Sequence, residues 1–262
     1  MAKAPIASAL RSCHSPARSL ISSRVESGFA NVTGGLLGVD ERRRVLVAAG
    51  VSLAVGAVAI QTALYLADVY LLDRRVGTFD VDGEGGLSAW SSSATTFSTA
   101  VLALLFALVQ SARRIEFYAL AAAAAFLSLD EVVIIHERIG LRVTDALDLS
   151  DTYLRVAWPV VYLPLLATVA LILFQLARTS TDPARSLLAV GLALLACAVG
   201  LEMGGLALDL IPSLTETSWL YTMEIALEEG AELAGWILLT TGVAVLLLAP
   251  DALVLGQERA ID

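Results

Sequence analysis

The stretch SLDEVVIIHE, residues 128–137, decides what kind of helix this chain can build. It closes an apolar run that begins near Glu116 and passes through the five alanines of residues 121–125. Three carboxylates and one imidazole therefore fall in the second half of a predicted membrane-spanning helix: Asp130, Glu131, Glu137 and His136. A charged side chain at the bilayer centre costs about 2.5–3.5 kcal/mol by insertion scales, so these groups indicate a functional site.

The composition of the whole chain supports a location in a lipid bilayer. Of its 262 residues, 57% are hydrophobic, whereas soluble domains are about 45–50% apolar. Apolar runs of about 20 residues recur, and each is long enough to cross a ~30 Å hydrocarbon core as a helix. A net charge of −9 argues against nucleic acid as a partner. The sequence contains no glycine-rich phosphate loop, so we expect no nucleotide cofactor.

The hydropathy pattern predicts an all-α, polytopic membrane bundle with six transmembrane helices. The expected spans cover residues 45–72, 89–110, 116–138, 156–177, 186–208 and 219–249. We therefore divide the chain into a polar, disordered N-terminal tail at residues 1–44, a transmembrane domain at residues 45–249 and a short C-terminal tail at residues 250–262. Residues 1–25 are basic and contain no acid, which fits an organelle targeting peptide, a cytoplasmic tail or an over-extended start.

The distribution of arginine in the short loops predicts the orientation of the bundle. Arginines precede the first span and follow the second and fourth spans: residues 42–44, Arg113, Arg114, Arg178 and Arg185. Loops rich in Lys and Arg stay in the cytoplasm, so both termini are expected there. We expect a multi-pass protein of a prokaryotic plasma membrane, with an organelle membrane as the alternative.

Acidic residues in several spans are predicted to meet in the outer half of the membrane. Glu224, Glu228 and Glu232 of the last span are four residues apart and therefore lie on one helix face. The span before it carries Glu202. A predicted polar pathway in the first two spans shares this depth, and it consists of Asp68, Ser92, Thr95 and Thr96.

The charge balance of this acidic cluster is the feature that points to function. It comprises seven acids: Asp130, Glu131, Glu202, Glu224, Glu228, Glu229 and Glu232. The predicted spans place no Lys or Arg at their depth, and Arg138, Arg142 and Arg155 at the outer rim reach only the shallowest acids. Carboxylates crowded in a low-dielectric region need protons, a metal ion or a cationic substrate to neutralise them. The alternative without a ligand is a set of protonated acids hydrogen-bonded between helices.

The sequence leaves three functions open. Carboxylates with one imidazole suit divalent Ca, Mn, Fe or Zn, and the expected metal ligands are Asp130, Glu131, His136, Glu137, Glu202, Glu224, Glu228 and Glu232. The leading hypothesis is a cation site used for transport, with Asp130 and Glu228 facing each other across it. The second is an intramembrane metalloenzyme that acts on a lipid. The third is an accessory subunit whose acids pair with a membrane partner, and a homo-oligomer is equally open.

Overall fold

A computed structural model describes residues 38–81, 85–110, 113–211, 214 and 218–248. The chain divides into two compact units, residues 1–42 and 43–262. Residues 38–42 are the described part of the first unit and include the start of one helix, so the following description concerns the second unit. The predicted C-terminal tail, and all but the last residues of the predicted N-terminal tail, lie outside the described residues.

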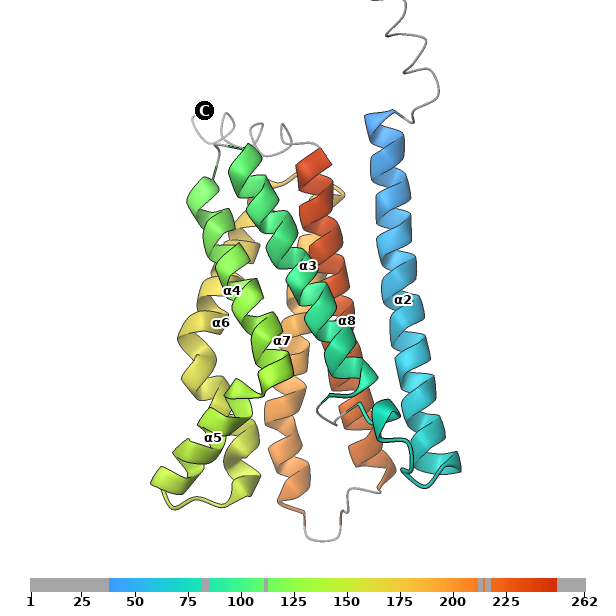
Figure 1. The fold of residues 1–262 in the computed structure, drawn as a ribbon, viewed down its shortest axis with the longest axis vertical. Helices are drawn as coiled ribbons and strands as arrows, with labels where there is room; N and C mark the ends of the chain where they lie inside the picture. Colours follow the sequence, from blue (N-terminus) through green and yellow to red (C-terminus); the bar gives the residue numbers. More distant parts are fainter. Residues whose placement is uncertain (1–37, 82–84, 111–112, 212–213, 215–217, 249–262) are drawn as a thin grey trace, which may run out of the picture. The chain divides into compact units, whose positions relative to one another are not determined.

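The described residues form helices and no strands, which confirms the predicted all-α class (Figure 1). The α-helices are α2 (Val39–Leu71), α3 (Leu87–Val109), α4 (Arg114–Val133), α5 (Ile135–Ala146), α6 (Leu154–Thr179), α7 (Ala184–Asp209) and α8 (Trp219–Leu248). Two single 3-10 turns, η1 (Gly77–Phe79) and η2 (Asp151–Tyr153), lie in the connections.

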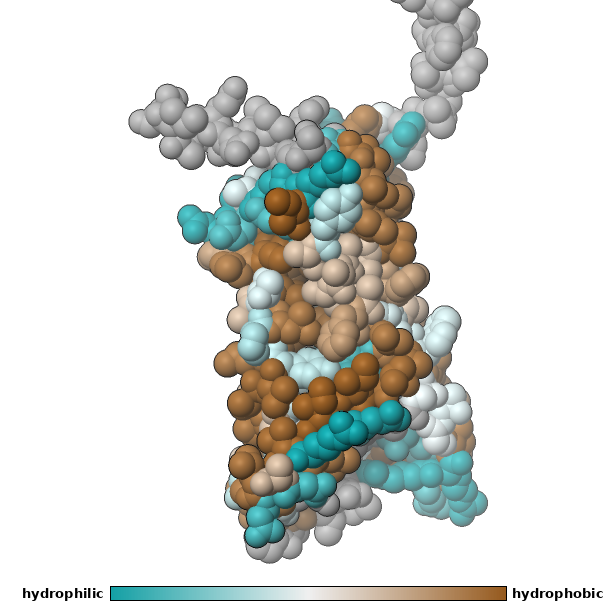
Figure 2. All heavy atoms as spheres, turned by 60° about the vertical axis from the view of Figure 1, so that its left-hand side comes forward, coloured by the Kyte–Doolittle hydropathy of each residue, from teal (hydrophilic) through white to brown (hydrophobic). Residues whose placement is uncertain are grey.

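Five of these helices are long and apolar enough to cross a membrane: α2, α3, α6, α7 and α8. The pair α4 and α5 passes the same test together, so the number of spans is five, or six if the bent pair is one span. Figure 2 shows one face on which hydrophobic side chains cover most of the height, with hydrophilic side chains near both ends. The chain is therefore a multi-pass integral membrane protein.

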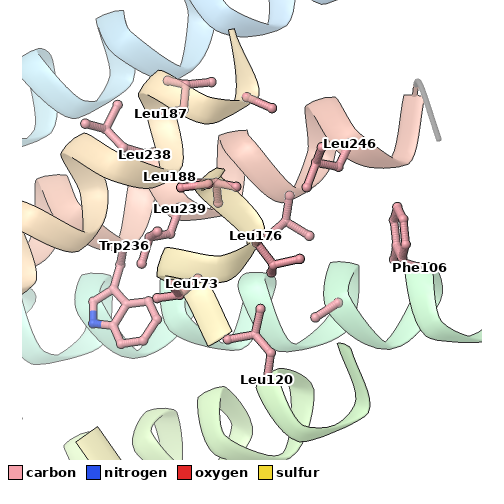
Figure 3. Packing of buried hydrophobic residues seen from close by; sticks show 14 of the residues in the cluster. Phe106, Leu120, Leu173, Leu176, Leu187, Leu188, Trp236, Leu238, Leu239 and Leu246 are labelled. Carbon is pink, nitrogen blue, oxygen red and sulfur yellow. The ribbon is translucent and has the colours of Figure 1, made fainter. Parts of the chain in front are cut away.

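The apolar core lies between α3, α4, α6, α7 and α8 (Figure 3). Phe106 of α3 stacks on Phe117 of α4 with ring centroids 3.9 Å apart. Helices α7 and α8 pack closely because each carries a glycine at the contact. A Cβ on Gly191 would lie 3.0 Å from the carbonyl oxygen of Gly235, so a larger residue would force the two helices apart.

The third predicted span, residues 116–138, is wrong as one continuous helix. It breaks at Ile134, whose φ is +60°, and α5 leaves α4 at an angle of 72°. A left-handed β-branched residue is strained and persists only where its surroundings hold it. Asp130 supplies that hold, because its Oδ1 accepts the backbone N–H of His136 at 2.8 Å and so caps the first turn of α5.

Helix α2 buries one stripe of small and polar residues. Its buried residues follow a helical spacing and are Gly50, Ala54, Gln61, Tyr65 and Asp68. The carboxylate of Asp68 accepts the backbone N–H of Val76 at 2.9 Å and so closes the turn after α2. Asp68 was predicted as part of a polar pathway, and its described contact is this structural one.

Candidate functional site

A cavity of about 290 Å³ lies between α3, α4, α5, α6, α7 and α8. Its ionisable lining comprises seven carboxylates, one imidazole and one guanidinium: Asp130, Glu131, Glu137, Glu202, Glu228, Glu229, Glu232, His136 and Arg155. The rest of its wall is mostly apolar and includes the two indoles of Trp158 and Trp236, with Thr96 as the hydroxyl from α3.

Helix α8 supplies the acidic side of the cavity because of its sequence spacing. Glu228, Glu232 and Trp236 follow one another at four-residue intervals and all line the cavity, as residues on one helix face do. Glu202 of α7 lines the same cavity as Glu228. Carboxyl groups crowded around one cavity repel one another unless they hold protons or bind a cation.

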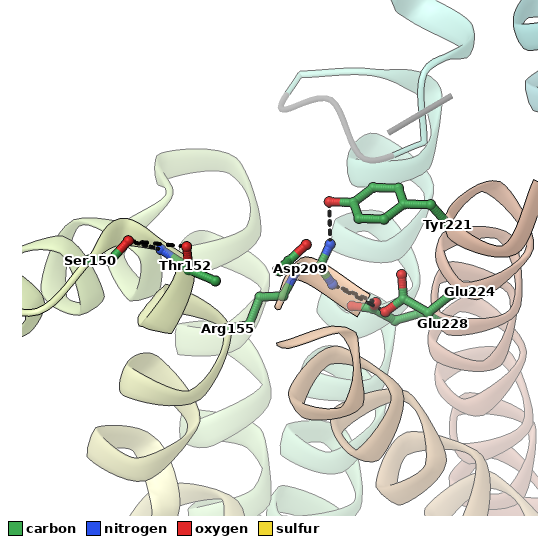
Figure 4. Close-up of polar contacts among 7 residues, drawn as sticks. All are labelled: Ser150, Thr152, Arg155, Asp209, Tyr221, Glu224 and Glu228. Carbon is green, nitrogen blue, oxygen red and sulfur yellow. Dashed lines mark hydrogen bonds and ion pairs between the residues drawn. The ribbon is translucent and has the colours of Figure 1, made fainter. Parts of the chain in front are cut away.

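Arg155 neutralises part of this acidic set from the first turn of α6 (Figure 4). Its Nη1 lies 3.1 Å from Glu224 Oε1 and 3.9 Å from Glu228 Oε2. Its Nε lies 3.2 Å from Asp209 Oδ2, and its Nη2 donates to the Tyr221 hydroxyl at 2.8 Å. One guanidinium therefore joins α6, α7 and α8.

The position of Arg155 corrects the predicted charge balance. The sequence predicts Arg155 at the outer rim, before a fourth span that starts at residue 156, and within reach of only the shallowest acids. The structure begins α6 at Leu154, and the long Arg155 side chain reaches inward between α7 and α8. Its side chain is only 13% exposed. Glu224 is occupied by this contact and does not line the cavity.

Asp130 is held by three donors and in turn orients His136. Its Oδ1 accepts the His136 backbone N–H and the Tyr162 hydroxyl, the latter at 3.0 Å. Its Oδ2 lies 2.9 Å from His136 Nδ1. The edge of the imidazole that carries Nε2 therefore points away from Asp130, and the ring packs against Trp158 at a centroid distance of 4.9 Å. A fixed imidazole beside a cavity is suited to moving a proton.

Glu229 lines the cavity and also accepts a hydrogen bond from α3. One of its carboxylate oxygens accepts the Ser88 hydroxyl at 2.7 Å, and Ser88 is buried. Glu229 belonged to the predicted acidic cluster but not to the predicted ligands.

The structure brings most of the predicted ligands together. Those that line the cavity are Asp130, Glu131, His136, Glu137, Glu202, Glu228 and Glu232, and Glu224 is the exception. Asp130 and Glu228 both line this cavity. Within the described part of the chain, however, no three His, Cys, Asp or Glu side chains are arranged to hold a metal ion.

The predicted polar pathway is brought together only in part. Thr96 lines the cavity, and its hydroxyl donates to the Ser92 carbonyl oxygen at 2.8 Å. Thr95 donates to the carbonyl oxygens of Ser91 and Ser92 at 2.9 Å. Ser92 is buried but does not line the cavity. Both threonine hydroxyls thus donate their proton to a carbonyl oxygen of their own helix, so neither is available as a donor to a ligand.

The sequence interpretation missed the face that α6 presents to the site. Arg155, Trp158 and Tyr162 are separated by three and four residues and therefore share one helix face. That spacing was readable in the sequence, but an arginine followed by two aromatic residues is also common where a span enters a membrane interface.

Residues 44–247 match a family described as "Domain of unknown function (DUF8692)". The chain belongs to this family. The match includes every residue that lines the cavity. No curated protein and no solved structure gives a significant match to the chain. The chemistry of the cavity therefore carries the functional interpretation.

Proposed function

We propose that this DUF8692 membrane protein binds a cation in the acidic cavity and uses the site for transport. The observation that carries the proposal is the charge imbalance of the lining, which has seven carboxylates against one guanidinium and one imidazole. Desolvated carboxylates are costly unless they are neutralised or paired. A bound cation would add positive charge beside the seven carboxylates that line the cavity.

The position of the cavity favours movement of the cation over storage at a surface. Four of the helices that wall it, α3, α6, α7 and α8, each have the length and apolar character of a membrane span. A cation bound there would lie among spanning helices, where ionisable groups typically mark ion and substrate paths.

The dimensions of the cavity favour a cation larger than a bare metal ion. A volume of about 290 Å³ far exceeds the ~10–15 Å³ that one buried water requires. The described residues offer no ready three-ligand metal site. A hydrated divalent ion or a small organic ammonium ion would fill the space, and the indoles of Trp158 and Trp236 suit an ammonium group through cation–π contact.

Ligand-dependent thermal unfolding of the purified protein tests the proposal. The probes are Mg²⁺, Ca²⁺, Mn²⁺ and Zn²⁺, each with and without chelator, and choline and putrescine as organic cations. At least one probe should raise the unfolding temperature of the wild type in a saturable way. Glu228→Gln removes one charged contact, worth about 1.5–3 kcal/mol, so its apparent affinity should fall roughly tenfold or more.

The matched control is Asp145→Asn, which removes the same charge from an exposed residue outside the cavity. It should keep the wild-type affinity. The proposal is refuted if no probe shifts the wild type, or if Glu228→Gln and Asp145→Asn respond alike.

A second candidate function, an intramembrane enzyme that acts on a lipid, has one observation in its favour. The Asp130–His136 pair is built as a proton acceptor would be, with the imidazole oriented by a carboxylate and facing a cavity. Lipid extracts incubated with wild type and with His136→Gln should then differ by one product. Identical lipid profiles would leave the cation site as the better account.

A further inference from the structure

Helix α5 carries an exposed basic face that the cavity does not use. Two arginines one helical turn apart, Arg138 and Arg142, are exposed on it together with Leu141. The opposite face is buried at Gly140 and Thr144, and a Cβ on Gly140 would contact Leu154 and Trp158 of α6. The helix is thus anchored along one side and presents its arginines on the other.

Both guanidinium groups lack a protein partner among the residues that the structure describes. No described side chain makes a hydrogen bond or an ion pair with Arg138 or Arg142, whereas Arg113 and Arg155 are each paired with carboxylates. Of the two acids in α5, Glu137 lines the cavity and the exposed Asp145 follows Arg142 by three residues, so the exposed face carries its positive charge at Arg138 and Arg142.

The two arginines follow directly after the exposed apolar surface of α4 ends. The last exposed apolar residues of α4 are Leu129, Val132 and Val133. Helix α5 then departs from α4 at an angle of 72° (Figure 1). Its side of the molecule comes forward in Figure 2, where hydrophilic side chains lie below the apolar surface. If α4 crosses the bilayer as far as Val133, Arg138 and Arg142 lie at the level of the lipid headgroups.

We infer that the exposed face of α5 binds the headgroups of anionic phospholipids through Arg138 and Arg142. A guanidinium group matches a phosphate in charge and in its paired donor geometry. Basic residues at the surface of a bilayer are attracted to anionic lipids. The inference does not depend on what occupies the cavity.

Lipid binding by native mass spectrometry tests the inference on the full chain in detergent. Wild-type protein should bind phosphatidylglycerol more tightly than phosphatidylcholine. Arg138→Gln with Arg142→Gln should weaken the apparent affinity for phosphatidylglycerol by roughly 10- to 30-fold and leave that for phosphatidylcholine unchanged. Arg138→Lys with Arg142→Lys keeps the charge and should retain most of the preference.

The control removes two other exposed arginines at the same end of the bundle. Arg74 and Arg75 are exposed in the turn after α2, outside any amphipathic helix. Their double glutamine variant should bind phosphatidylglycerol as the wild type does. Inorganic phosphate should not displace the lipid.

Three results would overturn the inference: no preference for phosphatidylglycerol in the wild type, equal losses in the two glutamine double variants, or displacement by inorganic phosphate. Unchanged binding of phosphatidylcholine would show that the glutamine double variant is folded. If that variant is not folded, the lysine double variant is used in its place.

Discussion

Gly205 is the position where the smallest change should disturb the Arg155 network. A Cβ added to this buried glycine of α7 would lie 2.6 Å from Glu224 Oε1 and 2.9 Å from the Arg155 Cζ. Both distances are shorter than real Cβ contacts. Because the neighbouring atoms are the ends of flexible side chains, Gly205→Ala should move the ion pair rather than the helices.

The expected loss of stability follows from the contacts that would move. Weakening one hydrogen bond to a charged group costs about 1.5–3 kcal/mol. Replacing a helical glycine by alanine returns about 1 kcal/mol. We therefore expect a net loss of about 0.5–2 kcal/mol, which in a domain of this size lowers the unfolding temperature by about 1–8 °C.

Thermal unfolding of purified protein measures this effect against a matched neighbour. Gly204 is exposed and a Cβ there would meet nothing within 4 Å, so Gly204→Ala should be neutral or slightly stabilising. In an Arg155→Gln background, Gly205→Ala should lose most of its cost, because residues that share a contact are not additive. Equal unfolding temperatures for the two alanine variants, or an undiminished cost in the Arg155→Gln background, would refute the reasoning.

Three further predictions concern topology, the shared cavity and the support of Asp130. In a cysteine-free background, an impermeant thiol reagent applied to intact cells should label Ser150→Cys and not Ser186→Cys, and the reverse pattern would invert the predicted orientation. Asp130→Asn and Glu228→Gln should each reduce cation-dependent stabilisation, with the double variant losing little more than the worse single one; additive losses, measured by thermal unfolding with and without the cation, would separate them into independent sites. Tyr162→Phe removes a buried hydrogen bond to Asp130 and should lower the free energy of unfolding by about 1 kcal/mol, as chemical denaturation would show; an unchanged value would mean that this hydroxyl does not hold Asp130.

The class of the fold was predictable because the bilayer demands long apolar helices. The predicted first, second, fourth, fifth and sixth spans each correspond to one helix with ends displaced by six residues or fewer. The four-residue spacing of Glu228 and Glu232 predicted a shared face, and both residues line the cavity together with Trp236. Such regularities depend only on helix geometry and solvent, so the sequence carries them directly.

The helix break at Ile134 was not predictable in the same way. The position holds neither glycine, proline nor asparagine, the residues that usually signal a left-handed turn. What permits the break is a contact between Asp130 and the backbone of His136, six positions apart. The full set of Arg155 contacts was not predictable for a related reason, because the reach of a long side chain between two neighbouring helices is not encoded in local periodicity.

The break also changes how the acidic residues should be ranked as ligands. Within a membrane, backbone groups released by a broken helix must find new partners, and Asp130 supplies one while it also accepts bonds from the His136 ring and Tyr162. Because three donors already contact the two oxygens of Asp130, few of its lone pairs remain to coordinate a cation. By contrast, Glu202 of α7 and Glu228 and Glu232 of α8 line the cavity, and Glu232 lies one helical turn after Glu228. The main cation contacts should therefore come from α7 and α8, with Asp130 acting through the imidazole that it positions.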